Sequence, residues 1–232
     1  MSTTDTSSPA AAPPTQTPYA KASYRYFALG VLTLVYALNF VDRQLLVILQ
    51  EQIKLELVLS DTQLGLLSGL SFAIFYVVCG IPIARWADKG VRRNIIALSL
   101  TVWSGMTAVS GLSQNYIHLL LARIGVGVGE AGGSPPAHSM ISDIFPEKER
   151  ATALSVYSIG IYIGILTGFA LGGFIAEAFG WRMAFFVVGV PGIVVALFLR
   201  FAVAEPIRGW SEKRETEAGD KPTFFTVLKF LW

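Results

Sequence analysis

Four ionisable residues lie inside long apolar stretches of the sequence, where a charge is costly. Asp42 and Arg43 are neighbours in the first apolar stretch, and Arg123 and Glu130 lie in the fourth. Placing a carboxylate or a guanidinium at the centre of a membrane costs about 2.5–3.5 kcal/mol on insertion scales. We therefore expect these side chains to face the interior of a helix bundle or a water-filled cavity, paired with one another.

The spacing of these residues puts them on one face of each helix. Asn39 precedes Asp42 by three residues and Arg43 by four, and helical residues at that spacing share a face. Arg123 and Glu130 are seven residues apart, which is about two helical turns. We therefore predict that two pairs of opposite charge form between the first and fourth helices.

Such pairs have two interpretations. They can be structural ion pairs that hold the first helix against the fourth. A closed buried ion pair, however, adds little net stability once desolvation is counted, whereas a transporter uses carboxylates that gain and lose protons as a cavity wets and dries. Arginine also grips a planar or phosphate-like anion through two parallel hydrogen bonds. We favour the functional interpretation.

The composition indicates that the helices carrying these residues span a membrane. Of 232 residues, 53% are hydrophobic and only 15% are charged, whereas a soluble domain carries about a quarter charged residues. A helix crosses the hydrocarbon core with roughly 20 mostly apolar residues. Six stretches of that kind are present: Phe27–Leu49, Leu64–Ala84, Asn94–Leu112, Ile117–Met140, Leu154–Phe179 and Ala184–Val203. The predicted fold class is an all-α polytopic membrane protein.

Several function classes are disfavoured by what the sequence lacks. The net charge of +2 gives no sign of a nucleic-acid partner. A single cysteine, Cys79, excludes a disulfide within the chain and a thiolate metal cluster, and His118 and His138 leave little for zinc chemistry. No nucleophile and base occur together in a loop, so we predict no enzyme activity, no cofactor and no metal site.

Basic residues predict the orientation in the membrane. Of the 18 lysines and arginines, Arg43 and Arg123 lie within spans, and 14 of the other 16 fall on one side if the N-terminus is cytoplasmic. The exceptions are Lys54 and Arg182. Cytoplasmic loops carry an excess of such residues. We therefore expect an integral protein of a bacterial inner membrane or a plasma membrane, with both termini cytoplasmic.

Composition shifts suggest four segments. Residues 1–23 are rich in Ser, Thr, Ala and Pro and are predicted to form a disordered cytoplasmic tail. Residues 24–204 are predicted to form the six-helix transmembrane domain. Residues 205–221 are predicted to form a cytoplasmic linker, which begins with Glu205-Pro206, where the sixth helix ends. Residues 222–232 restart an apolar helix. We expect them to begin a truncated C-terminal half, so that a six-helix half is missing.

The fifth span carries a glycine at every fourth position: Gly160, Gly164, Gly168 and Gly172. Small residues let helices in lipid approach closely. The pattern leaves two alternatives open, namely tight packing alone or an interface that slides during function.

A short basic loop joins the second and third spans and contains Asp88, Lys89, Arg92 and Arg93. With this loop, the chain resembles the N-terminal half of a major facilitator superfamily transporter. The resemblance implies two inverted three-helix repeats, in which the first and fourth spans are equivalent. It also implies a gating role for the four loop residues at the cytoplasmic mouth, together with Arg150, which we expect to bond across to Asp88.

Within the superfamily, residues 39–43 (Asn-Phe-Val-Asp-Arg) and 127–131 (Gly-Val-Gly-Glu-Ala) are most similar to the Spinster lipid transporters. That resemblance implies a proton-coupled carrier of a small amphiphilic substrate, a sphingosine-phosphate-like lipid or lysophospholipid, working by alternating access. Asp42 and Glu130 would then handle protons, and Arg43, Arg123 and Asn39 would bind the headgroup.

Two other functions remain open. One is an organic-anion/proton symporter of the same superfamily, since such symporters also place an acid and an arginine late in the first helix. The other is a non-transporting membrane half-protein that acts as a receptor or scaffold.

Overall fold

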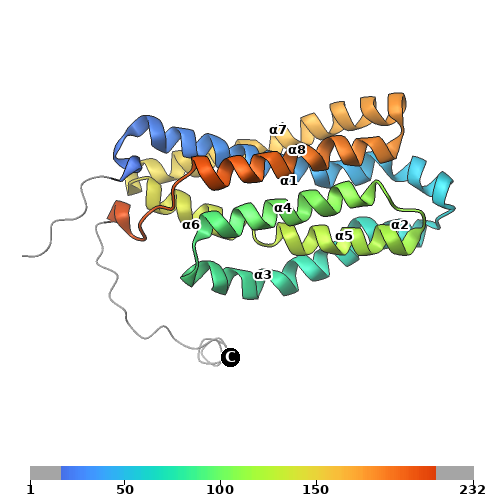
Figure 1. Cartoon of the computed structure of the whole chain (residues 1–232), viewed down its shortest axis with the longest axis horizontal. Helices are drawn as coiled ribbons and strands as arrows, with labels where there is room; N and C mark the ends of the chain where they lie inside the picture. The colour runs from blue at the N-terminus through green and yellow to red at the C-terminus, as the bar shows by residue number, and fades with distance from the viewer. Residues whose placement is uncertain (1–16, 213–232) are drawn as a thin grey trace, which may run out of the picture.

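A computed structural model describes residues 17–212, and within that range it contains helices and no strand (Figure 1). The 3₁₀ turns Pro18–Ala20 and Trp210–Glu212 flank the helical bundle. The helices are α1 (Ala22–Leu57), α2 (Asp61–Gly65), a π-helical turn (Leu66–Leu70), α3 (Ser71–Lys89), α4 (Arg92–Ser110), α5 (Tyr116–Glu130), α6 (Ser134–Ile144), α7 (Glu147–Phe179) and α8 (Trp181–Ala202). The segments predicted at residues 1–16 and 222–232 lie outside the described residues.

These helices correspond to the six predicted spans. The second span is α2, the π-helical turn and α3 in series, and the fourth is α5 and α6 lying end to end (Figure 1). Four spans are long and apolar enough to cross a membrane by length and composition alone: the helical stretches 22–57, 61–89, 147–179 and 181–202. The remaining two lie beside them but fall short, because α4 begins with two arginines and α5 has only 15 residues.

Helix packing follows the pseudo-symmetry expected for two inverted three-helix repeats. The first helix of the first repeat, α1, packs mainly on α7, the second helix of the other repeat. In the matching contact, α5 packs on α3, while the third helices α4 and α8 pack on each other. The predicted repeat architecture is therefore confirmed.

The glycine ridge of α7 is the surface on which α1 rests. A Cβ atom added at Gly160 would lie 2.7 Å from the carbonyl oxygen of Thr33, and one at Gly168 would lie 3.2 Å from that of Val41. A Cβ at Gly173, beside the ridge, would meet nothing within 4 Å. The ridge therefore permits close helix packing, as the pattern predicted. Whether this interface also slides remains a prediction.

The fourth span is broken between Glu130 and Ser134. Pro135 and Pro136 have no backbone N–H, so the carbonyls four residues earlier cannot form their usual helical hydrogen bonds. Residues 131–133 form a turn instead, and the helix restarts at Ser134. The break places Glu130 at the last position of α5.

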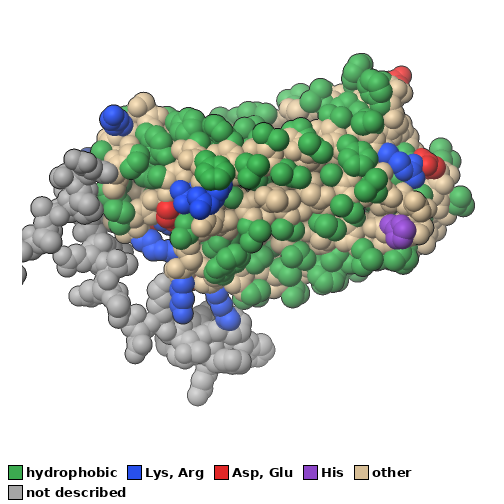
Figure 2. Space-filling model, in the orientation of Figure 1, with side chains coloured by type: hydrophobic (Ala, Val, Ile, Leu, Met, Phe, Trp, Pro, Cys, Tyr) green, Lys and Arg blue, Asp and Glu red, His purple; other side chains and the backbone are tan. Residues whose placement is uncertain are grey.

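Two buried apolar clusters fill the bundle, one toward each end. The cluster near the chain ends includes Leu32, Ile96 and Met140, and the opposite cluster includes Leu49 and Phe185. Hydrophobic side chains are spread over the surface between the ends, as expected where lipid is the solvent (Figure 2). The buried Asp42 of α1 and Arg123 of α5 lie between the two clusters.

The start of the described chain is packed against its end, at what we call the terminal end of the bundle (left in Figure 1). Tyr19 is buried and donates a hydrogen bond to the carbonyl of Ala204, and Tyr24 donates to the carbonyl of Ala202 at 2.9 Å. Burial raises the pKa of the Tyr19 phenol. Residues 17–23 of the predicted tail are therefore part of the folded domain. The contacts of Tyr19 come from a segment far away in sequence, which composition does not reveal.

Candidate functional site

The first charged pair joins α1 to α5 and is sealed inside the bundle. Arg123 Nη1 lies 3.2 Å from Asp42 Oδ2, and the residues are 3% and 1% exposed. Thr107 of α4 donates its hydroxyl to Asp42 Oδ1 at 2.5 Å. Both oxygens of the carboxylate are therefore bonded. We call Asp42 and Arg123 the sealed pair, and the Thr107 hydroxyl is its third member.

Little space surrounds the sealed pair. A hollow beside Asp42 is lined by Leu38, Trp103 and Thr107 among others, and it is too narrow to admit a water molecule. The Nε atom of Arg123 is buried without a hydrogen-bond partner among the described residues. In this conformation the pair is thus closed to solvent.

The second charged pair also joins α1 to α5 but reaches open space on one side. Arg43 Nε lies 2.7 Å from Glu130 Oε2. The Arg43 side chain is 31% exposed, whereas that of Glu130 is fully buried. The other oxygen, Glu130 Oε1, has no hydrogen-bond donor among the described residues. We call this the open pair.

Aromatic rings surround the guanidinium of the open pair. The Arg43 Cζ atom lies 5.3 Å from the ring centre of Phe40, 5.0 Å from that of Phe72 and 5.3 Å from that of Tyr76. A cation over an aromatic face is attracted by the ring quadrupole. The rings therefore hold Arg43 in place by a contact that does not depend on Glu130.

Both interhelical pairs predicted from the sequence are thus present. Asn39 lies one turn before them on α1, where it is 5% exposed. Sequence reasoning missed Thr107, Phe72 and Tyr76. Phe72 and Tyr76 are four residues apart on one face of α3, and that spacing was the available signal.

A second cluster of charges lies at the terminal end, around Arg92. This residue is 1% exposed and pairs with Asp143 of α6 and, at 2.9 Å, with Glu205 Oε1. It also donates to Ser139 Oγ at 2.8 Å and to the carbonyl of Pro206 at 3.0 Å. The Arg92 guanidinium is therefore fully occupied by groups of this domain.

The segment after α8 completes this cluster. The backbone N–H of Arg93 donates to Glu205 Oε2 at 2.8 Å, and Arg93 Nη1 donates to the carbonyl of Val203 at 3.2 Å. Arg208 Nη2 donates to the carbonyls of Ala87 and Gly90 at 2.7 and 2.8 Å. The described part of the predicted linker, residues 205–212, is therefore packed against the α3–α4 connection.

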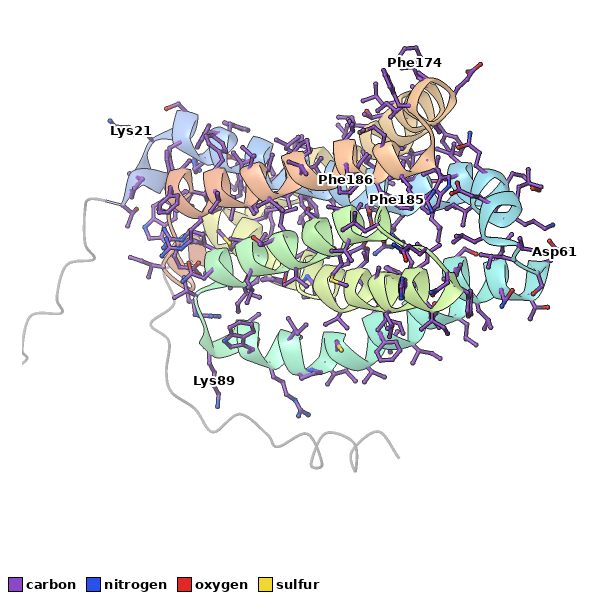
Figure 3. All side chains as sticks on the ribbon, turned by 45° about the vertical axis from the view of Figure 1, so that its right-hand side comes forward. Lys21, Asp61, Lys89, Phe174, Phe185 and Phe186 are labelled. Atoms are coloured by element: carbon purple, nitrogen blue, oxygen red, sulfur yellow. The ribbon has the colours of Figure 1, made fainter. Side chains whose placement is uncertain are left out.

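The predicted gating residues consequently separate into two groups. Asp88 and Lys89 are exposed, and Lys89 points away from the bundle (Figure 3). Arg92 is buried and Arg93 is half-buried. Arg150, which we expected to reach Asp88, donates to Ser211 Oγ at 3.3 Å. This partner comes from the segment after α8, a contact that the loop sequence could not indicate.

Within residues 17–212, no group of three or more His, Cys, Asp or Glu side chains is arranged to hold a metal ion. The chemistry available at the centre of the domain is therefore that of two carboxylates, two guanidinium groups and the hydroxyl of Thr107 around them.

The family model of the Major Facilitator Superfamily matches residues 32–232. The chain belongs to the Major Facilitator Superfamily. It is 42% identical over 169 residues to an MFS-type efflux pump of Mycolicibacterium smegmatis, covering 73% of this chain and 39% of that protein. It is 32% identical over 192 residues to a probable galactarate/D-glucarate transporter of Bacillus subtilis, covering 80% and 42%.

The fold is also that of a solved superfamily structure. A bacterial homologue of the human lysosomal transporter Spinster, in an inward-facing and unoccupied conformation, superimposes with a TM-score of 0.80 at 40% identity. The match covers 90% of this chain and 49% of the other. The chain therefore spans less than half the length of these relatives, and its helices correspond to one half of a major facilitator fold.

Proposed function

We propose that this chain is the N-terminal half of a proton-coupled secondary transporter for an amphiphilic organic anion. The supporting observation is the open pair, in which Arg43 is partly exposed while Glu130 is buried with one oxygen unbonded. A purely structural pair would leave neither an accessible cation nor an unbonded carboxylate oxygen. The similarity to a sphingosine-1-phosphate transporter of Danio rerio, 29% identical over 189 residues, supports a sphingosine-phosphate-like lipid or a lysophospholipid as the substrate.

The geometry supports an exchange of partners at Arg43. An incoming carboxylate or phosphate binds the exposed edge of the guanidinium and displaces Glu130. Because Glu130 is fully buried, its ionised form is then left without a counter-charge, so it takes up a proton. The aromatic rings keep Arg43 in place throughout. Anion binding and proton uptake are coupled in this way.

Asp42 and Arg123 have a later role in this scheme. Their pair opens when the cavity changes its accessible side, and Asp42 then exchanges its proton while Arg123 contacts the substrate headgroup. The sealed geometry supports this order, because no water reaches Asp42 in the present conformation. Asn39 contributes to the same substrate site from the neighbouring turn of α1.

The proposed orientation places the terminal end in the cytoplasm of a bacterial inner membrane or plasma membrane. Lysine and arginine are concentrated at that end in the sequence. There, exposed Asp88 and Lys89 are available to a second six-helix half, while Arg92, Arg93 and Arg150 shape the surface from within. Alternating access would make and break the contacts between the halves.

A second candidate is an organic-anion/proton symporter with a small polar substrate. The relative described as a probable galactarate/D-glucarate transporter favours it. The same open pair serves either substrate, because a sugar acid also presents a carboxylate to Arg43. A non-transporting half-protein is the remaining alternative, and it predicts neither substrate binding nor proton movement.

Uptake into proteoliposomes tests the proposal. With an inward proton gradient, the complete transporter is expected to accumulate lysophosphatidate, and Glu130→Gln or Asp42→Asn to abolish the response to the gradient. Arg43→Gln should weaken substrate binding more than Arg43→Lys does. D-glucarate uptake without lysolipid uptake would select the second candidate, and uptake that ignores the gradient in the unmodified protein would refute proton coupling.

A further inference from the structure

One buried polar side chain near the open pair has no partner. Asn39 is 5% exposed, and its amide forms no hydrogen bond with any residue in the range 17–212. The amide atoms keep a small accessible area, because they are not among the completely buried and unbonded polar atoms of the described residues. Unpaired polar groups are rare in folded proteins and need an explanation.

Asn39 faces a small hollow between α1, α4, α6 and α7. The residues that line the hollow are Val35, Tyr36, Asn39, Trp103, Gly133, Ser134 and Tyr157. Its free space is close to that of a single water molecule. Tyr36 and Tyr157 stack with ring centres 4.3 Å apart and planes 8° apart, which fixes one wall. The hollow thus fits one small polar group.

The lining limits which polar group can enter. No lysine, arginine, aspartate or glutamate lines the hollow. A second charged group of a ligand would therefore lose its hydration without compensation. The Asn39 amide offers both donors and an acceptor, and the Ser134 hydroxyl offers one of each. A hydroxyl, which also both donates and accepts, matches this lining.

The hollow lies about one helical turn from Arg43 along α1 and four residues from Glu130 along the α5–α6 segment. Asn39 precedes Arg43 by four residues on α1, and Ser134 follows Glu130 by four across the break between α5 and α6. Four residues of helix rise about 6 Å. A ligand whose anionic group binds Arg43 would therefore reach the hollow with a substituent a few bonds away.

We infer that the hollow binds a hydroxyl group of the substrate, so that the transported molecule is a hydroxylated organic anion. This inference rests on the proposed function, because it requires the anion at Arg43. A lysolipid with a free hydroxyl and a polyhydroxy acid share this chemistry. It would explain how one site architecture serves relatives as different as a Spinster homologue and a probable galactarate/D-glucarate transporter.

Matched ligands test the inference with the purified protein in phosphatidylcholine nanodiscs. The first pair is 1-oleoyl lysophosphatidate and the analogue that lacks its 2-hydroxyl. The second pair is D-glucarate and adipate, which differ only in hydroxyl groups. For one of these pairs the hydroxylated member is expected to bind about fivefold tighter or more, the range of one net hydrogen bond. The pair that shows the preference identifies the source of the hydroxyl.

Variants then assign the preference to the hollow. Asn39→Leu, which has nearly the same shape, should bring the affinity ratio close to one while leaving the affinity for the deoxy ligand within about twofold. Asn94→Leu, an asparagine of α4 outside the hollow, should keep the preference. If Asn39→Leu does not fold, Ser134→Ala serves instead and should reduce the ratio at least twofold.

The outcomes separate this inference from the proposed function. Anion binding at Arg43 without any hydroxyl preference would overturn the inference and leave the function standing. A preference that survives both Asn39→Leu and Ser134→Ala would also overturn it. Failure of all four ligands to bind would refute the inference and the proposed function together.

Discussion

The sealed pair and the open pair both join an arginine to a carboxylate between α1 and α5, yet their surroundings differ. Both oxygens of Asp42 are bonded, and Asp42 and Arg123 are at most 3% exposed. In the open pair, Arg43 is 31% exposed and Glu130 keeps one oxygen unbonded. Neighbouring charges on one helix can thus occupy very different environments, because adjacent residues point in directions about 100° apart.

This difference indicates which pair stabilises the fold and which pair responds to a ligand. Removing one partner of the sealed pair strands a charge that neither water nor a neighbour can compensate. In the open pair, an external anion can replace Glu130, and the aromatic rings hold Arg43 meanwhile. We therefore expect mutations of the sealed pair to lower stability and to affect only the later proton step, and those of the open pair to act mainly on substrate binding and the proton uptake that accompanies it.

The largest effect is expected from breaking the sealed pair. Arg123→Leu leaves Asp42 buried with only the Thr107 hydroxyl, so unfolding free energy should fall by about 3–5 kcal/mol. The double variant Asp42→Leu with Arg123→Leu removes both charges and should recover most of that loss. Thermal unfolding in detergent measures both variants. A double variant no more stable than Arg123→Leu alone would contradict this description of the pair.

A smaller and pH-dependent loss is expected from Arg43→Leu. The variant strands Glu130 only while Glu130 is ionised, and protonation removes that charge. The variant should therefore lose about 1–3 kcal/mol at alkaline pH and recover as the pH falls. Melting temperatures across a pH series give the comparison, with Arg123→Leu as the reference. A loss that is equal at all pH values would place Arg43 in the same class as Arg123.

Thr107→Val measures how much the Thr107 hydroxyl stabilises the sealed pair. Valine keeps the shape of threonine but removes the hydroxyl that bonds Asp42, so a loss of about 1 kcal/mol is expected. Ser104→Ala changes another hydroxyl on the same hollow that has no bond to Asp42 and is the matched control. Equal stability of Thr107→Val and the unmodified protein would show that the hydroxyl does not support the pair.

The smallest effect is expected from Phe72→Leu, which removes one ring beside Arg43. The change should raise the substrate KM two- to fivefold, because an exposed cation–π contact contributes about 0.5–1 kcal/mol. Phe75→Leu alters an exposed ring of α3 that does not contact Arg43 and should leave KM unchanged. Equal KM values for both variants would remove the rings from the substrate site.

The sequence was sufficient for the spans and for both charged pairs, because charges in apolar helices have few ways to be compensated. Helical spacing also indicated the ridge of Gly160 to Gly172 that packs on α1. It could not indicate that Asp42 would take Thr107 as a partner, since a lone threonine in an apolar helix is common and needs no partner. Which pair would be sealed depends on tertiary packing, which spacing does not specify.

The terminal end shows a second limit of sequence reasoning. One motif contains Asp88, Lys89, Arg92 and Arg93, and it gives no indication that these residues differ in burial. The structure buries Arg92 among Asp143, Glu205 and Ser139 and leaves Lys89 exposed. The burial of Arg92 depends on α6 and on the segment after α8, and the place of that segment could not be derived from a linker-like composition.

Proton uptake during anion binding distinguishes the roles of Glu130 and Asp42. In weakly buffered solution with a pH indicator, the unmodified protein should take up about one proton for each substrate anion bound. Asp42→Asn, although less stable, should show the same proton uptake, since Asp42 is closed to solvent while the anion binds at Arg43. Glu130→Gln should bind the anion with no proton uptake. Proton uptake that persists in Glu130→Gln, or that disappears only in Asp42→Asn, would contradict the assignment of the open pair as the responsive one.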